Sequence, residues 1–175
     1  MKIIAFAGSN SSKSINKKLV TYASSLFANY EVEILDLRNY QAPLFSVDVE
    51  KEIGKSQEAV GFLEKLKSAD LLLISLAENN GNYSTAFKNI FDWSSRIEKD
   101  VFQNKPVFLM ATSPGGRGGK GVLDIAQSNL PRYGANIKEV FSLPLFNENF
   151  DVENGKISNA EFDAQLKEIV NNFAV

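Results

Sequence analysis

An apolar run near the start of the chain, together with the polar loop after it, limits the fold more than any other feature of the sequence. Residues 3–7 (IIAFA) carry no polar side chain, which is typical of a strand covered on both faces of a parallel sheet. Gly8 ends the run, and a polar segment leads into a helical pattern that begins near Ile15. A buried strand, a polar loop and a helix in this order predict the first unit of an α/β domain.

The same alternation continues along the chain. Further strands are expected at 31–37, 69–76, 107–111 and 136–141, and helices near 15–26, 59–68, 84–97, 121–130 and 158–173. Residues 38–57 show no sustained period and are expected to form an irregular connection. The alternation predicts one domain over residues 1–175, built on a doubly wound five-stranded parallel sheet of order 2-1-3-4-5 with helices on both faces.

Two missing residue types restrict the chemistry. The chain has no cysteine and no histidine, which excludes disulfides, thiolate nucleophiles, the Ser-His-Asp triad and the commonest metal ligand. An enzyme of this composition must use carboxylates, Lys or Tyr, or take its chemistry from a cofactor. We therefore expect no metal site.

Charge and hydropathy point to a cytoplasmic protein. The net charge of −2 argues against binding to nucleic acid or to an acidic membrane surface. No apolar run approaches the roughly 20 residues that span a bilayer. The first residues lead directly into a strand, without the charged-then-apolar pattern of a signal peptide.

The first loop is unusually rich in hydrogen-bonding side chains. Six Ser and Asn residues lie between Ser9 and Asn16, around a single helix start. Helix capping needs one of them, whereas a phosphate site at a helix N-terminus uses several donors, so we favour phosphate binding over capping alone. Neither G-x-G-x-x-G nor G-x-x-x-x-G-K-[ST] is present, which excludes the two common glycine-built phosphate loops.

Two more loops are richer in polar or glycine residues than a turn requires. They come after the third and fourth strands, at 78–83 and 113–119. In the order 2-1-3-4-5 the first, third and fourth strands are neighbours, so their loops share the carboxyl edge of the sheet. This layout predicts a mononucleotide site, with the phosphate in the first loop and the ring between the other two.

The sequence resembles a known family over about residues 1–140, the flavodoxin-like NADPH-dependent FMN reductases, which include chromate, quinone and azo-dye reductases. Three motifs in the expected order carry the resemblance. The first is met at Gly8, Ser9, Ser14, Asn16 and Leu19, the second at Glu78, Asn80, Lys88, Asn89, Asp92 and Trp93, and the third at Ser113, Gly115, Gly116 and Gly119.

The resemblance implies non-covalent FMN, NAD(P)H as co-substrate, a small-molecule electron acceptor, and a homodimer or homotetramer. It implies no catalytic side chain, because the flavin would carry the redox chemistry. The cofactor-binding residues that it implies are Ser9, Ser11, Ser14, Ile15, Asn16, Glu78, Asn79, Asn80, Gly81, Ser113, Pro114, Gly115 and Gly116.

The sequence departs from the family pattern at two site positions. Ser11 stands where the family usually has an arginine, and Asn79 stands where it has a tyrosine. These departures keep open the alternative of a flavin-free interaction module on the same fold. A flavodoxin-like FMN electron carrier is a second alternative, which the small net charge of −2 makes less favoured.

For several individual side chains the sequence allows two interpretations. Glu78 could act as an acid or base, or it could be a structural hydrogen-bonding group. Arg117 and Lys120 attract an NADPH phosphate, or are solvated loop charges. The aromatic residues of the third helix form a dimer contact or pack in the core, and Asp92 is expected to pair with Lys88, four residues earlier.

Overall fold

The computed structural model describes residues 1–173 and contains the expected doubly wound sheet. Five parallel strands pair in the order β2-β1-β3-β6-β7, which is 2-1-3-4-5 when the strands of this sheet are counted along the chain. The fold prediction is therefore confirmed, including the edge position of the second strand. The strands are β1 (Lys2–Gly8), β2 (Glu31–Leu35), β3 (Leu71–Leu76), β6 (Pro106–Thr112) and β7 (Asn136–Leu143).

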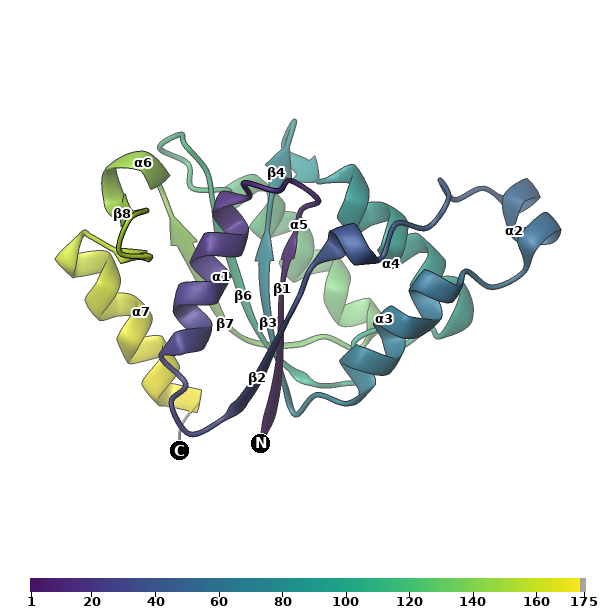
Figure 1. Cartoon of the computed structure of the whole chain (residues 1–175), viewed down its shortest axis with the longest axis horizontal. Helices are drawn as coiled ribbons and strands as arrows, with labels where there is room; N and C mark the ends of the chain where they lie inside the picture. Colours follow the sequence, from purple (N-terminus) through teal and green to yellow (C-terminus); the bar gives the residue numbers. More distant parts are fainter. Residues whose placement is uncertain (174–175) are drawn as a thin grey trace.

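Helices cover both faces of the sheet (Figure 1). Helices α1 and α7 pack on one face, and α3, α4 and α5 pack on the other. The long helices are α1 (Ile15–Ser25), α3 (Gln57–Lys67), α4 (Thr85–Ile97), α5 (Lys120–Asn129) and α7 (Ala160–Phe173).

The two faces of the sheet build two separate hydrophobic cores. Ile3 and Ala5 of β1 join the core under α1 and α7, whereas Ile4 and Phe6 join the core under α3, α4 and α5. Alternate residues of a strand point to opposite faces, so a strand buried on both sides needs an unbroken apolar run. The central strands have such a run, because all six residues of β3 are buried.

The structure corrects the sequence prediction in the connections. Residues 38–57 are not wholly irregular, and residues 78–83 and 144–157 also contain short elements. These pieces are too short to show a clear hydrophobic period, so periodicity could not reveal them. They are η1 (Leu37–Asn39), α2 (Val47–Ile53), the hairpin β4 (Glu78–Asn79) with β5 (Asn82–Tyr83), η2 (Leu130–Tyr133), α6 (Phe146–Asn149), and the hairpin β8 (Phe150–Asp151) with β9 (Lys156–Ile157).

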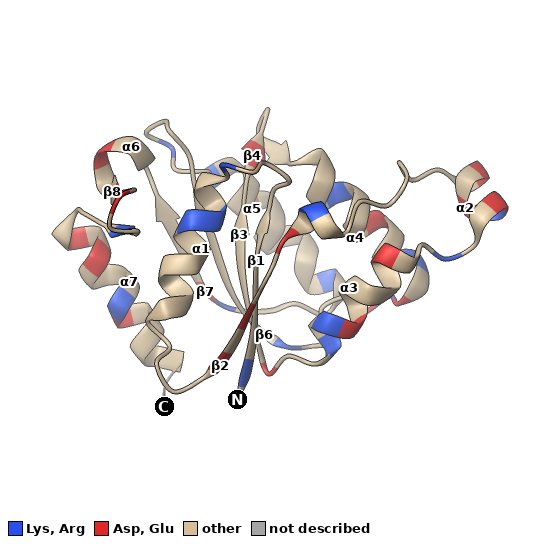
Figure 2. Ribbon diagram, viewed as in Figure 1, with Lys and Arg blue, Asp and Glu red and all other residues tan. Residues whose placement is uncertain are grey.

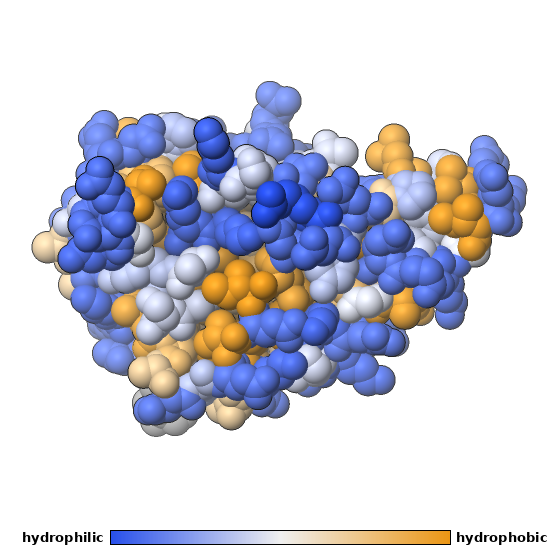
Figure 3. Space-filling view, viewed as in Figure 1, coloured by the Kyte–Doolittle hydropathy of each residue, from blue (hydrophilic) through white to orange (hydrophobic). Residues whose placement is uncertain are grey.

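Residues 43–54 form an arm that leads away from the body of the molecule and carries α2, a helix with no buried residue (Figure 1). Two residues of α4 fasten its base. Trp93 donates its indole N–H to the carbonyl of Pro43 at 2.7 Å, and Asn89 accepts the backbone N–H of Phe45 at 2.8 Å. The ribbon in Figure 2 marks acidic residues on α2, and Figure 3 shows apolar surface on the arm.

The aromatic residues of α4 are core residues. Phe87, Phe91 and Trp93 are at most 4% exposed and lie in the core of their own chain, so core packing rather than a dimer contact accounts for them. The expected pair of Lys88 with Asp92 is present, with Nζ 2.7 Å from the carboxylate. Within residues 1–173, no helix is long and apolar enough to cross a membrane and no cluster of acidic side chains could hold a metal.

Candidate functional site

The three polar loops lie together at the carboxyl edge of the sheet, as the sequence predicted. Gly8, the last residue of β1, is paired with Leu76 at the end of β3, and Leu76 is paired with Ala111 near the end of β6. Three strands that end side by side place their loops side by side, along the upper edge in Figure 1. This is the edge at which open α/β sheets bind ligands.

A buried amide joins two of these loops from below. Asn16, only 3% exposed, accepts hydrogen bonds through Oδ1 from the hydroxyl of Ser75 at 2.8 Å and from the backbone N–H of Thr112 at 2.9 Å. Its Nδ2 donates to the carbonyl of Thr112 at 3.1 Å. The side chain of Asn16 is thus used to connect the start of α1 with β3 and β6.

The serine hydroxyls of the first loop are oriented by backbone N–H groups. Ser9 accepts from the N–H of Ser11, Ser11 accepts from that of Lys13, and Ser14 caps α1 by accepting from that of Lys17. In the described part of the chain none of these three hydroxyls donates to a protein acceptor. Each can therefore give its O–H to an anion above the loop.

Backbone donors add to this group. The N–H groups of Ser12, Ile15 and Asn16 find no acceptor among residues 1–173, as is normal for the first turn of a helix. Their free N–H groups and the positive end of the α1 dipole favour a bound anion. The loop can therefore cap α1 and bind an anion at the same time. The Ser14 oxygen caps the helix, and the free N–H groups remain available to the anion.

A carboxylate next to the first loop is neutralised by two cations. Asp36 lies 2.5 Å from the Nζ of Lys17 and 2.6 Å from the guanidinium of Arg38. Arg38 first, and Lys17 after it, hold the pKa of Asp36 well below its usual range, against the opposing effect of burial. Asp36 is therefore ionised near neutral pH, and its charge is compensated within the protein.

The second loop is a hairpin whose first residue reaches across to α5. Glu78 Oε2 accepts the backbone N–H of Val122 at 3.0 Å, where α5 begins after Gly119, a residue with no side chain to cap it. A Cβ on Gly121 would lie 3.0 to 3.2 Å from the carboxylate, so a larger residue there would displace Glu78 by a few tenths of an ångström. Glu78 is a structural hydrogen-bonding group, and it joins the second loop to the third.

The tip of this hairpin is exposed at the rim. Asn80 and Gly81 both have positive φ, 51° and 73°, which is the conformation that a two-residue type I′ turn needs. Tyr83, just after the tip, turns inward instead, and its ring meets Phe87 edge to face at 5.1 Å. Its buried hydroxyl has no hydrogen-bond partner in residues 1–173, and burial raises the pKa of Tyr83 above its usual value.

The third loop is held tightly from behind. The carbonyls of Ser113 and Gly115 accept the N–H groups of Phe146 and Leu145 at 3.0 and 3.1 Å. Gly118 has a φ of +58°, and a Cβ there would lie 2.4 Å from Ser142 Oγ. The backbone of Gly115 and Gly116 is in contrast exposed, which leaves one side of the loop open to a flat ligand.

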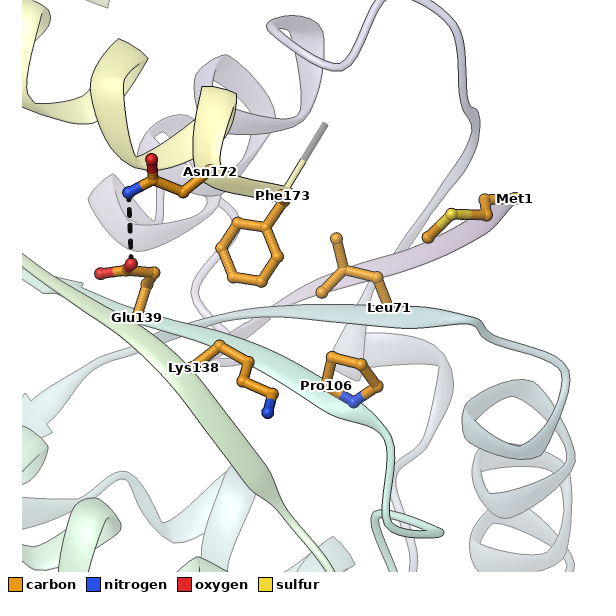
Figure 4. A pocket seen from close by; sticks show the side chains of 7 residues that line it. All are labelled: Met1, Leu71, Pro106, Lys138, Glu139, Asn172 and Phe173. Carbon is orange, nitrogen blue, oxygen red and sulfur yellow. Dashed lines mark hydrogen bonds between the residues drawn. The ribbon is translucent and has the colours of Figure 1, made fainter. Parts of the chain in front are cut away.

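Two cavities lie apart in the molecule. One, of about 370 Å³, runs beside the first and second loops and is lined by Asn10, Asn79 and Ser84 together with Leu44 at the base of the arm. The other, of about 390 Å³, lies at the opposite, amino edge of the sheet between Leu71 and the end of α7 (Figure 4). Of these two cavities, the first adjoins the predicted site and the second does not.

Comparison of this chain with known proteins identifies a family that fits the predicted mononucleotide site. A sequence profile of the NADPH-dependent FMN reductases matches residues 1–148. The chain belongs to the NADPH-dependent FMN reductase family. It is 32% identical over 132 residues to a 2-hydroxy-1,4-benzoquinone reductase of Burkholderia, an alignment that covers 74% of this chain and 68% of the relative.

Two further matches have lower sequence identity. An NAD(P)H-dependent FMN reductase of Pseudomonas aeruginosa is 29% identical over 116 residues, which cover 66% of this chain and 61% of the relative. Among solved structures, the flavoenzyme NAD(P)H:(acceptor) oxidoreductase FerB of Paracoccus denitrificans superposes with a TM-score of 0.78 at 21% identity, over 98% of this chain and 94% of its own. At that identity the structural likeness shows the fold.

The residues at the carboxyl edge fit the FMN of this family. Free hydroxyl and backbone donors gather at one helix start, and exposed glycine backbone stands at the third loop. The predicted residues of all three loops are brought to this edge, although the side chains of Asn16 and Glu78 are occupied by protein partners. Sequence reasoning missed Ser75 and Thr112, whose part in the site depends on contacts between distant segments.

Proposed function

We propose that this protein is an NAD(P)H-dependent reductase that binds FMN non-covalently at the carboxyl edge of the sheet. FMN held there would supply the redox chemistry, namely hydride transfer from NAD(P)H and electron transfer to a small acceptor such as a quinone, an azo dye, a metal oxyanion or free flavin. With neither histidine nor cysteine in the chain, a bound cofactor is the direct source of this chemistry.

The first loop carries the proposal furthest. The N–H groups of Ser12, Ile15 and Asn16 and the hydroxyl of Ser14 would hold the FMN phosphate through neutral donors and the helix dipole. Asn16 contributes its backbone N–H, while its side chain holds the loop against β6.

The other two loops would border the flavin ring. Asn79, Asn80 and Gly81 stand on one side, and Ser113 to Gly116 stand on the other. The hydrogen bond from Val122 to Glu78 sets the distance between these two walls. No side chain of the chain is assigned a proton-transfer role.

A visible titration of the purified protein with FMN, and then with NADPH under nitrogen, tests the proposal. We expect perturbed bands of bound flavin that bleach when NADPH is added and return with an acceptor. Riboflavin lacks the phosphate and so loses the charge-assisted hydrogen bonds from the first loop. It should therefore bind at least about 100-fold more weakly than FMN.

The other outcomes separate the alternatives. Bound flavin that bleaches with dithionite and not with either nicotinamide nucleotide would indicate an electron carrier. Absence of FMN binding would contradict the proposal and favour an interaction module on this fold.

We further infer that the protein forms a dimer through its arm. Leu44, Val47 and Ile53 are 73%, 55% and 46% exposed on a segment that Asn89 and Trp93 hold in place. Leu44 also lines the cavity beside the first two loops, so a second copy that covers the arm would extend to the site. The mass in solution tests this, since the triple serine variant of the three exposed residues should be monomeric.

A further inference from the structure

A groove lies on the far side of the glycine-rich third loop. It has a volume of about 650 Å³ and is bounded by α5, the end of β7 and α7. Gly116 lines it, and Gly116 also belongs to the loop that we assign to the flavin ring. The groove therefore adjoins the proposed cofactor site at this loop, but it is distinct from that site.

Two cations stand where the groove meets the loop. The side chains of Arg117 and Lys120 line it, and neither forms a hydrogen bond or an ion pair with any residue in the range 1–173. Both lie at the surface of the loop that leads into α5. They supply an unneutralised positive charge at one end of a formed cavity.

In the described chain Lys120 forms no ion pair, although an acidic residue lies four positions further along the helix. Asp124 is four residues further along α5 and lines the same groove, yet within the described chain the two do not pair. On α4 the same spacing and order do pair, with Lys88 Nζ at 2.7 Å from Asp92. Among the described residues that line the groove, Asp124 carries the negative charge and Arg117 and Lys120 carry two positive charges. The net charge of the lining is therefore positive.

The loop that carries the cations is rigidly placed. Ser142 donates its hydroxyl to the carbonyl of Gly118 at 3.0 Å, and the N–H of Leu145 is bonded to the carbonyl of Gly115 at 3.1 Å. A preformed site loses little conformational entropy when a ligand binds.

The remainder of the groove suits a flat heterocycle. Leu123, Val140 and Phe162 give it an apolar wall, and the amides of Gln127 and Gln165 stand at its edge. An aromatic base could pack on the apolar side chains and exchange hydrogen bonds with the amides, while a phosphate would meet the cations.

We propose that this groove binds the 2′-phosphoadenosine end of NADPH, with Arg117 and Lys120 on the 2′-phosphate. This inference rests on the proposed function, because the nicotinamide end must reach the flavin across Gly116. Arginine offers a planar pair of donors to the phosphate and lysine offers a point charge, and NADH has no group for either. The two cations would thus select NADPH over NADH.

Calorimetry with adenosine 2′,5′-bisphosphate and with 5′-AMP tests the groove without depending on flavin chemistry. The protein should bind the bisphosphate at least about tenfold more tightly. The double variant R117Q/K120Q should lose that preference and keep its FMN affinity within about twofold. The matched control K67Q/K99Q removes two exposed lysines elsewhere and should behave as the wild type.

Turnover gives a second readout. R117Q/K120Q should raise the KM for NADPH about tenfold and leave that for NADH unchanged. Equal affinity for the two adenosine nucleotides, or an unchanged preference in the variant, would overturn the inference even if FMN binds normally. If R117Q/K120Q changes the mass of the protein in solution and K67Q/K99Q does not, the groove binds a second copy of the chain and the inference is overturned. Failure of FMN binding in the separate flavin titration would instead contradict the proposed function.

Discussion

Asn16 holds both backbone groups of Thr112, a residue 96 positions further along the chain. Its Oδ1 accepts the N–H at 2.9 Å and its Nδ2 donates to the carbonyl at 3.1 Å, while the hydroxyl of Ser75 shares the same Oδ1. One side chain thereby aligns the first loop with the ends of β3 and β6. This buried amide therefore helps to fix the position of the first loop relative to the third.

Replacement of Asn16 by alanine should destabilise the protein without FMN by about 3 kcal/mol, because it leaves the buried polar groups of Ser75 and Thr112 without partners. Urea denaturation of the apoprotein measures this effect. Asn10→Ala is the matched control, since Asn10 is exposed and has no hydrogen bond from its side chain within the described residues. A loss below about 0.5 kcal/mol for N16A would show that water replaces the amide.

Glu78 joins the other pair of loops, and its removal should have a smaller effect. E78A should lower the free energy of unfolding by about 1 kcal/mol, because α5 then begins without a cap. E78Q keeps an oxygen acceptor for the N–H of Val122 and should lose less. E78A should also weaken FMN binding, since the second loop is then no longer joined to α5, whereas E78Q should bind FMN nearly as the wild type does.

Differential scanning calorimetry and FMN titration check these two variants against E64A, which removes an exposed glutamate of α3. If E78A matches E64A in stability, the hydrogen bond to Val122 does not stabilise α5. If E78Q abolishes turnover while FMN still binds normally, Glu78 has the acid or base role that the structure does not assign to it.

The sequence predicted the sheet well because a strand that is buried on both faces needs an unbroken run of apolar residues, which is easy to recognise. The apolar runs at 3–7 and 107–111 are typical of central strands, and the order of elements leaves few topologies. The positions of the three loops are then set by the topology. The helix α2 left no such pattern, because it buries none of its residues and so has no period to detect.

Individual side chains of the site were less predictable. The motif containing Ser14 and Asn16 predicted an anion site at the first loop, but it gave no sign that the amide of Asn16 points inward to Thr112. That contact and the one from Glu78 to Val122 join segments far apart in sequence through backbone groups. Backbone partners have no residue identity, so a single sequence gives no sign of them.

Tyr22 of α1 donates its hydroxyl to the carboxylate of Asp163 on α7, and this bond should make stability depend on pH in alkali. Burial, and then the hydrogen bond to Asp163, raises the pKa of Tyr22 to about 12. An unfolded tyrosine ionises near pH 10, so the native state holds the extra proton between about pH 10 and 12. The stability that Tyr22 contributes is complete below about pH 10 and is lost as the pH rises through about 12.

The variant Y22F isolates this contribution. The wild type should be more stable than Y22F by about 1 kcal/mol at about pH 8, and the difference should shrink between about pH 10 and 12. Chemical denaturation at each pH measures it, with Y30F as the control for a tyrosine on the same face of the sheet. A difference that stays constant up to about pH 12 would contradict the assignment.

Ser11 stands where the family usually has an arginine, and it is exposed in the first loop, to which we assign the FMN phosphate. S11R should bind FMN about tenfold more tightly than S11Q, because a guanidinium adds charge-assisted hydrogen bonds to the phosphate. S11Q is the matched control, since both variants lose the bond from the N–H of Lys13 to the serine hydroxyl. Riboflavin should bind the two variants equally, and the gain for FMN should fall as salt screens the charges. If FMN affinity is the same for S11R and S11Q, the phosphate does not lie at this loop.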